Sequence, residues 1–185
     1  MIRNKLLWKN NKQQYGLISK GLHWLSALAV FVLFGLGYWM VDLDYYSEWY
    51  QRAPHWHESV GLLLLIVTLF RLVWRGIAIK SEAISSHSDL ERKSSAIMAF
   101  ALYFILLTVL ASGYLITSAD GKAIAVFDWF NVSAFILIAE NQEDLAGEIH
   151  YYIAYTLIFM ALIHGLAAIK HHFIDKDNTL KRMIK

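Results

Sequence analysis

The sequence contains no cysteine among its 185 residues. It therefore cannot form a disulfide, a thiolate metal site or the Cys-x-x-Cys-His motif that attaches haem covalently. Charged residues are also few, at 17% of the chain, whereas 57% of the residues are hydrophobic. With a mean hydropathy of +0.41, this is not the composition of an ordinary soluble domain. Because no linker or internal repeat interrupts the chain, residues 1–185 are expected to form a single membrane domain.

Four apolar runs are long enough to cross a bilayer as helices. They cover residues 21–41, 54–76, 96–117 and 149–169. The first run is too long for a signal peptide and lacks a small-residue cleavage site, so we expect an uncleaved span rather than a signal peptide. The single proline, Pro54, stands where the second helix is expected to begin, a position that suits proline. Ser94 or Ser95 is the expected N-cap of the third helix.

Residues 118–147 are the hardest segment to assign. Within them, residues 123–139 are apolar but contain Asp128 and Asn131, with two aromatic residues between these positions. We expect a periplasmic loop that includes a helix lying in the membrane interface. The alternative interpretation is a fifth membrane span.

Basic residues are scarce in two of the loops. Of the 17 lysines and arginines, fifteen lie before residue 21, between Arg71 and Lys93, or from Lys170 onward, and the other two are Arg52 and Lys122. An excess of basic residues marks the cytoplasmic side of a membrane protein. The distribution predicts an all-α, four-helix transmembrane bundle with both termini in the cytoplasm. A fifth span would put the basic tail on the wrong side.

Histidines stand in three of the four apolar runs. His150 and His164 stand 14 residues apart in the last run, which in a helix is a rise of about 21 Å and about 40° short of a whole number of turns. They therefore share one helix face, near opposite sides of the membrane. His57 opens the second span at the level of His150, and His23 lies in the first span at the level of His164.

The two depth-matched pairs predict two metal centres. Ionisable side chains inside a span are expensive and tend to be functional, and neutral imidazoles on facing bundle helices are common haem ligands. The simplest interpretation is two non-covalent haems b, one held by His57 and His150, the other by His23 and His164. Alternatively, each histidine is a hydrogen-bonded residue packed against a neighbouring helix. His171 is an alternative partner for His23.

Other residues near the pairs have two interpretations each. Arg71 lies 14 residues after His57, on the same face, where it is a candidate to bind a haem propionate or a lipid phosphate. Gly61 and Gly165, close to His57 and His164, either let a flat macrocycle approach or let helices pack. Of the remaining histidines, His55 is two residues from His57 and points elsewhere on the helix, and His87 and His172 are expected to be solvated.

Six short segments carry a more specific signal. They are Leu22-His-Trp24, Trp56-His-Glu-Ser-Val-Gly61, Glu148-Ile-His150, Ile163-His-Gly165, His171-His172 and the tail from Lys176 to Met183. Together they resemble the bacterial cytochrome b561 family, small dihaem proteins of the cytoplasmic (inner) membrane related to hydrogenase cytochrome b subunits. By this resemblance, His23, His57, His150 and His164 are the axial ligands of the haems.

The resemblance also implies an activity. Family members pass electrons between membrane quinone and a second redox partner, and one type is similar to a superoxide oxidase that delivers electrons to ubiquinone. The outer segments contain ten acidic residues but only two basic ones, Arg52 and Lys122, and such a surface attracts the superoxide anion poorly. A local basic site could still bind superoxide, and Lys122, in the loop between the third and fourth spans, is the candidate catalytic residue.

Three functions remain open from the sequence. The first is a quinone-linked oxidoreductase of the membrane, acting alone. The second is a haem-bearing electron conduit or membrane anchor whose catalysis belongs to a partner redox protein. The third is a haem-free transporter or metal permease with histidine ligands. Membrane lipid is the expected surrounding in each case, and no nucleic-acid partner is expected.

Overall fold

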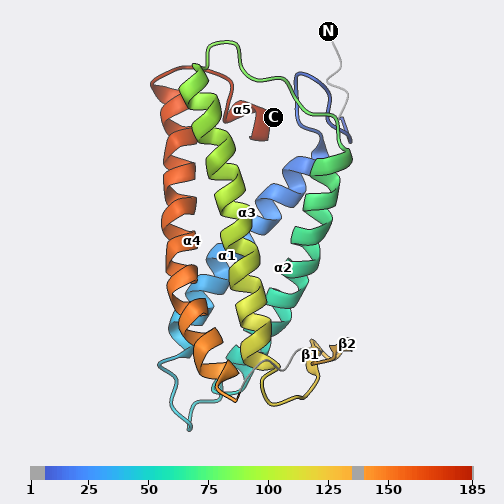
Figure 1. Ribbon diagram of the computed structural model, residues 1–185, viewed down its shortest axis with the longest axis vertical. Coiled ribbons are helices and arrows are strands. Elements are labelled where there is room, and N and C mark those ends of the chain that lie inside the picture. The colour runs from blue at the N-terminus through green and yellow to red at the C-terminus, as the bar shows by residue number, and fades with distance from the viewer. Residues whose placement is uncertain (1–6, 135–139, 185) are drawn as a thin grey trace.

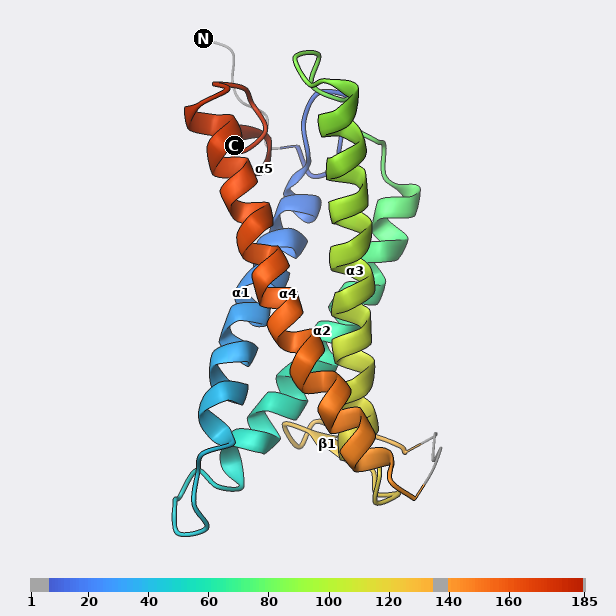
Figure 2. The same cartoon turned by 60° about the vertical axis from the view of Figure 1, so that its left-hand side comes forward.

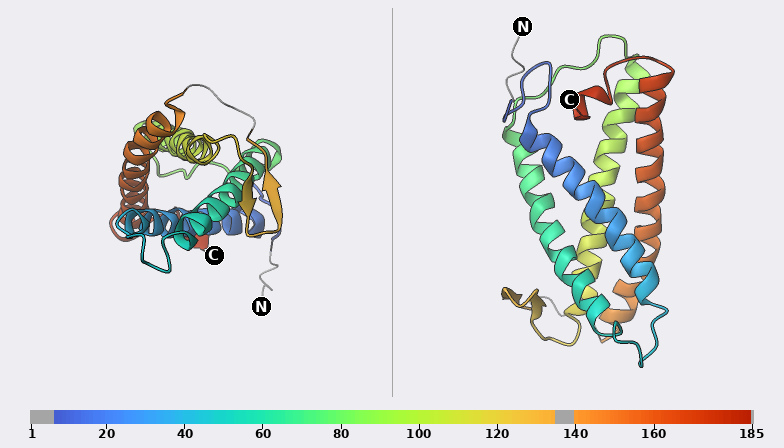
Figure 3. Two further views of the ribbon diagram at one scale, coloured as in Figure 1. Left: turned by 90° about the horizontal axis from the view of Figure 1, so that it is seen from below. Right: turned by 180° about the vertical axis from the view of Figure 1, so that it is seen from behind.

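The computed structural model describes residues 7–134 and 140–184. Its four long helices are α1 (Leu17–Met40), α2 (Arg52–Ile77), α3 (Asp89–Thr117) and α4 (Gln142–Phe173), and each is long and apolar enough to cross a membrane. Successive helices run in opposite directions around a common centre (Figure 1, Figure 3). Within the described residues, the prediction of four membrane-spanning helices is confirmed.

The two ends of the bundle differ (Figure 2). We call one the terminal end, because the start of α1, the end of α4 and the short helix α5 (Lys181–Ile184) lie there. The opposite end, the hairpin end, carries the 41–51 connection and two short strands, β1 (Ile124–Val126) and β2 (Phe130–Val132). Every odd-numbered long helix therefore begins at the terminal end, and every even-numbered one begins at the hairpin end.

Small or aliphatic side chains fill the centre of the bundle. One buried cluster draws on all four long helices and consists of Leu33, Leu64, Leu106, Val109 and Leu157. Buried polar side chains in the spans include Ser26, Ser59, Thr68 and Ser112. Many large apolar side chains of the same helices are exposed instead. Small residues let helices approach closely in lipid, and the outward apolar surface suits contact with acyl chains.

The structure corrects the prediction for residues 118–147, of which those from Gln142 onward belong to α4. Instead of an interfacial helix, the described part of this segment contains an antiparallel sheet of β1 and β2, so the fold is mostly helical rather than all-α. Phe127 and Asp128 have φ angles of 44° and 59°, which a right-handed helix does not allow. The Trp129 amide donates to the Val126 carbonyl at 2.8 Å and closes the turn between the strands.

The hairpin is attached to the first turns of α2. The side chains of the first and last residues of β1, Ile124 and Val126, are buried in a cluster with Leu62. The Ser59 hydroxyl accepts from the Phe127 amide at 3.1 Å and donates to the Ala125 carbonyl at 3.4 Å. Because Ser59 is two residues from His57, the hairpin is held against the helical turn that carries this histidine.

Helix α3 begins before the predicted caps. Its N-cap is Ser88, not Ser94 or Ser95. The Ser88 hydroxyl accepts from the Glu91 amide at 3.3 Å, and the Glu91 carboxylate accepts from the Ser88 amide at 2.8 Å. This capping box satisfies two amides that a helix start leaves without intrahelical partners. The apolar run thus marks only the inner part of a longer helix.

Replacing Ser88 by alanine is expected to lower the free energy of unfolding by about 1 kcal/mol, because the cap is lost. Ser94→Ala changes the same side chain inside the helix and is the matched control, with little expected effect. Denaturant unfolding of the detergent-solubilised protein, followed by circular dichroism, measures both. Equal losses in the two variants would contradict the cap assignment.

Candidate haem-binding sites

At the hairpin end, α2 and α4 bring two histidines together. The ring centroids of His57 and His150 are 6.1 Å apart, with their planes at 70°. His150 Nδ1 lies 3.0 Å from the Val109 carbonyl and 3.2 Å from the Ser112 hydroxyl. A proton on Nδ1 that is donated to this carbonyl leaves Nε2 free to bind a metal. Metal-bound histidines typically use their second nitrogen in this way, which fixes the tautomer and the ring orientation.

At the terminal end, α1 and α4 form a second pair. The ring centroids of His23 and His164 are 6.3 Å apart, with their planes at 73°. Arg71 of α2 reaches the same level, where its guanidinium donates to His23 Nδ1 at 2.8 Å and lies over the Tyr103 ring, with Cζ 5.2 Å from the centroid. The arginine therefore contacts a candidate ligand directly.

The spacing of both pairs fits a metal held between two imidazoles. If a metal–nitrogen bond is about 2.0 Å long and the ring centroid lies about 1.1 Å behind the nitrogen, two rings on opposite sides of one metal have centroids about 6.2 Å apart. The observed separations of 6.1 and 6.3 Å bracket this value. Both pairs thus have the donor chemistry and the separation of bis-histidine ligation.

The surroundings of His57 point the same way. Its Nδ1 is buried and forms no well-aligned hydrogen bond with any described residue, although the Leu33 carbonyl lies near the ring. Buried polar atoms are normally paired. The ring of His57 is therefore only weakly held by α1, the helix of Leu33, and is available to a further partner.

Two glycines lie against the rings at the hairpin end. A Cβ atom at Gly37 of α1 would be 3.0 Å from His57 Cε1, and one at Gly113 of α3 would be 3.2 Å from His150 Cε1. The first distance is shorter than a normal packing contact, and the second leaves little room. The sequence does not point to either glycine, because each faces a histidine on another helix and neither is near a histidine in the chain.

The glycines that the sequence did suggest behave differently. A Cβ atom at Gly61 or Gly165 would meet no other residue's atom within 4 Å, apart from the neighbouring backbone of its own helix. Close packing of helices therefore does not explain either position. The other interpretation of Gly61 and Gly165, that they leave room for a flat macrocycle, stays a prediction.

Three other residues singled out in the sequence lie away from the pairs. His171 hydrogen-bonds to Asp177 at 2.8 Å, so His164, not His171, faces His23. His87, expected to be solvated, has a side chain only 15% exposed. Lys122 is exposed and forms an ion pair with Asp120 at 2.7 Å; the hydrogen bond between them lowers the pKa of Asp120 and raises that of Lys122.

Paired histidines inside a bundle of membrane-spanning helices define a class, the multi-pass membrane haem proteins. The family model described as prokaryotic cytochrome b561 matches residues 14–185, which is nearly the whole chain. The protein belongs to the prokaryotic cytochrome b561 family, as its motifs predicted.

Curated relatives agree with this assignment. The chain is 45% identical over 175 residues to cytochrome b561 homolog 2 of Escherichia coli (strain K12), covering 95% of this chain and 93% of the relative. It is 26% identical to cytochrome b561 homolog 1 of the same organism, covering 88% and 92%. It is 24% identical to the probable superoxide oxidase CybB of Yersinia pestis, covering 93% and 96%.

Family membership fixes the general biochemistry. The protein is a multi-pass haem protein of the bacterial inner membrane that takes part in electron transport, and the family implies haem b. The ring separations of the two histidine pairs are compatible with an iron between the rings.

The glycine at position 37 is expected to be necessary for the hairpin-end site. Gly37→Val places side-chain atoms against the His57 ring and should reduce the haem bound, by up to one haem per chain. Gly35→Val, two residues away on the same helix, is the matched control, since a Cβ there would meet nothing within 4 Å. Haem per chain, from the pyridine haemochrome spectrum, measures the effect. Equal haem contents in the two variants would show that the close approach is not required.

Proposed function

We propose that this protein binds two non-covalent haems b and transfers electrons between a donor at the hairpin end and quinone in the membrane. One haem would be held by His57 and His150, and the other by His23 and His164. The observation that supports this most is the pair of ring separations, 6.1 and 6.3 Å, at two levels of one bundle. When bound, haem supplies one-electron chemistry at its iron.

Helix α4 sets the arrangement of the two sites. It contributes one histidine to each pair, and the 14 residues between them correspond to about 21 Å of rise. The two pairs therefore lie near opposite ends of the bundle, as electron transfer across a membrane requires. If both histidines of a pair held the haem, they would leave its iron no open coordination position, which would favour electron transfer over binding of a small molecule.

Arg71 has a specific part in this proposal. Coordination through Nε2 leaves the proton of His23 on Nδ1, and a protonated Nδ1 cannot accept a hydrogen bond from Arg71. With a haem held by His23, the guanidinium would no longer bond to His23 and could stay over the Tyr103 ring. A haem propionate is the carboxylate it would bind, because arginine pairs with carboxylates through two parallel hydrogen bonds.

The proposed orientation places the terminal end in the cytoplasm. The support is the charge distribution. Among the described residues, every lysine and arginine except Arg52 and Lys122 belongs to the part of a helix or connection on the terminal-end side, and basic residues favour the cytoplasmic side. The electron donor would then meet the protein on the periplasmic side, at the hairpin end.

Two donors remain candidates at that end. A relative is named a probable superoxide oxidase, which makes superoxide one of them, and a partner redox protein is the other. Lys122, the cation expected to attract superoxide, is paired with Asp120. Because the carboxylate offsets the ammonium charge, we give Lys122 no catalytic role and propose quinone-linked electron transfer as the core activity.

Alanine variants of the four histidines test the haem sites. We expect His57→Ala and His150→Ala to remove the same haem, and His23→Ala and His164→Ala to remove the other, because six-coordinate low-spin iron needs both imidazoles. The wild type should contain two haems per chain, all extractable with acid acetone. Haem content and the reduced-minus-oxidised spectrum of each purified variant report this directly.

His171→Ala is the control for these variants and should retain both haems. If it loses the terminal-end haem while His164→Ala keeps it, the ligand of that site is His171 and the proposed pairing is wrong. A stoichiometry of one haem per chain would also contradict the proposal.

The role of the Lys122 ion pair can be tested separately. If superoxide is a donor, Asp120→Asn should increase its rate of haem reduction at low ionic strength, because it removes a negative charge and leaves the ammonium unpaired. Lys122→Gln should slow that reaction only slightly. Reduction by quinol, measured in the same stopped-flow experiment, should be unchanged in both variants. A large loss in Lys122→Gln would restore Lys122 as a catalytic residue.

A further inference from the structure

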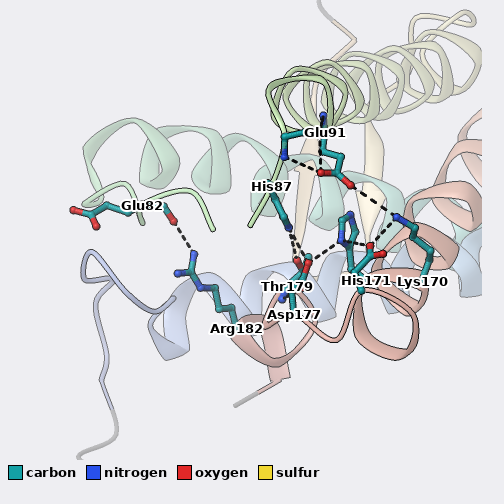
Figure 4. Close-up of polar contacts among 10 residues, drawn as sticks. Glu82, His87, Glu91, Lys170, His171, Asp177, Thr179 and Arg182 are labelled. Carbon is teal, nitrogen blue, oxygen red and sulfur yellow. Dashed lines mark hydrogen bonds and ion pairs between the residues drawn. The ribbon is translucent and has the colours of Figure 1, made fainter. Parts of the chain in front are cut away.

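Two imidazoles converge on one carboxylate oxygen at the terminal end, away from both haem sites (Figure 4). His87 Nε2, from the connection between α2 and α3, lies 2.9 Å from Asp177 Oδ2. His171 Nδ1, from the last turn of α4, lies 2.8 Å from the same oxygen. The side chains are 15%, 16% and 6% exposed for His87, His171 and Asp177. Two parts of the chain that are distant in sequence, the connection that carries His87 and the end of α4 with the residues after it, thus form one sheltered polar cluster.

The backbone after α4 is shaped to place the carboxylate there. Lys176 has a φ of 56°, and the Asp177 amide donates to the His171 carbonyl at 3.1 Å. Asp177 Oδ1 accepts from the Thr179 amide at 2.7 Å, which leaves Oδ2 directed to the imidazoles. Outer hydrogen bonds of this kind orient the ligands of metal sites.

Hydrogen bonds surround the Asp177 carboxylate. Burial raises the pKa of Asp177, but hydrogen bonds from Thr179, His87 and His171 outweigh this and hold the pKa well below its usual range. An ionised carboxylate beside two imidazoles is a donor set for a cation.

One proton cannot satisfy the acceptors around His171. Its Nδ1 lies 2.9 Å from Asp175 Oδ2 as well as 2.8 Å from Asp177 Oδ2, and an imidazole N–H has a single proton to donate. Glu91, His171 and Asp175 form a second group whose ligand atoms lie within 4.8 Å of one another. The ammonium of Lys170 lies 2.7 Å from Asp175 and 3.8 Å from Glu91. The carboxylates of Glu91, Asp175 and Asp177 thus outnumber the single ammonium of Lys170. This excess of negative charge favours binding of a further cation.

We propose that His87, His171 and Asp177 bind a divalent transition-metal ion of the zinc type. Two imidazole nitrogens and one carboxylate oxygen are ligands that Zn²⁺ prefers, with a fourth position left for water. With bonds of about 2.0 Å, tetrahedral ligand atoms lie about 3.3 Å apart, so the two shortest contacts need to open by about 0.5 Å. The three ligand atoms already lie within 4.8 Å of one another.

The bound ion links the tail to the connection between α2 and α3. Arg182, near the C-terminus, makes a second link, because its guanidinium donates to the Glu82 carbonyl at 2.7 Å. The site does not depend on haem, so it is independent of the proposed electron-transfer function.

Zinc binding can be tested on the full haem-containing chain, purified in detergent without a histidine tag and stripped with a chelator. Elemental analysis should find one Zn²⁺ per chain after reloading, and titration calorimetry gives the affinity. Asp177→Asn and His87→Gln should each weaken binding at least about 100-fold, since loss of an outer-shell contact alone costs 10- to 100-fold. His172→Ala removes a neighbouring imidazole outside the cluster and should bind as the wild type does. The haem spectrum of each variant checks that it is folded.

Limited trypsin digestion gives a second readout that does not need a variant. Chelation of the wild type should speed cleavage in the tail, at Lys176 or Lys181, and Zn²⁺ should reverse this. The proposal is overturned if the wild type binds no zinc, or if both variants bind it undiminished. It is equally overturned if the variants loosen the tail while zinc has no effect on the wild type, because the cluster would then be a set of hydrogen bonds only. If Asp177→Asn does not fold, His87→Gln and the digestion of the wild type decide.

Discussion

An imidazole inside an apolar bundle needs partners for its nitrogens, and here the imidazoles meet across the bundle, between helices that are not its most closely packed pairs. Leaving a polar group unpaired in such a place costs roughly 2–7 kcal/mol, more than most single packing contacts contribute. Helix α4 faces α2 at one level through His57 and His150, and faces α1 at the other through His23 and His164. The small side chains and the glycine at position 37 that line the interior are consistent with space kept for these rings, while bulky apolar residues face outward.

The levels of the four histidines could be predicted from the sequence because helical rise is constant and the apolar runs define where each helix crosses the membrane. What surrounds the rings could not be predicted. Gly37 and Gly113 are far from the histidines in the chain, and their role follows only from how the helices cross. The contact of Arg71 with His23 and with the Tyr103 ring depends on that same crossing.

The ends of the elements were less predictable than their centres. An apolar run locates a span but not the helix around it, so the cap at Ser88 was missed in favour of serines nearer the run. The apolar stretch after α3 suggested a helix, but the positive φ angles at Phe127 and Asp128 turn it into a hairpin packed on α2. The sheltered position of His87 was also missed, since Asp177 approaches it from the far end of the chain.

The continuous course of α4 limits how sequences of this kind can change in length. Inserting or deleting one residue between positions 150 and 164 would turn one histidine by about 100° relative to the other and shift it by about 1.5 Å. One of the two pairs would then be lost whichever way the helix settled. Insertions and deletions in the connections between helices would keep both histidine pairs. Between positions 150 and 164 of α4, only substitutions would keep them.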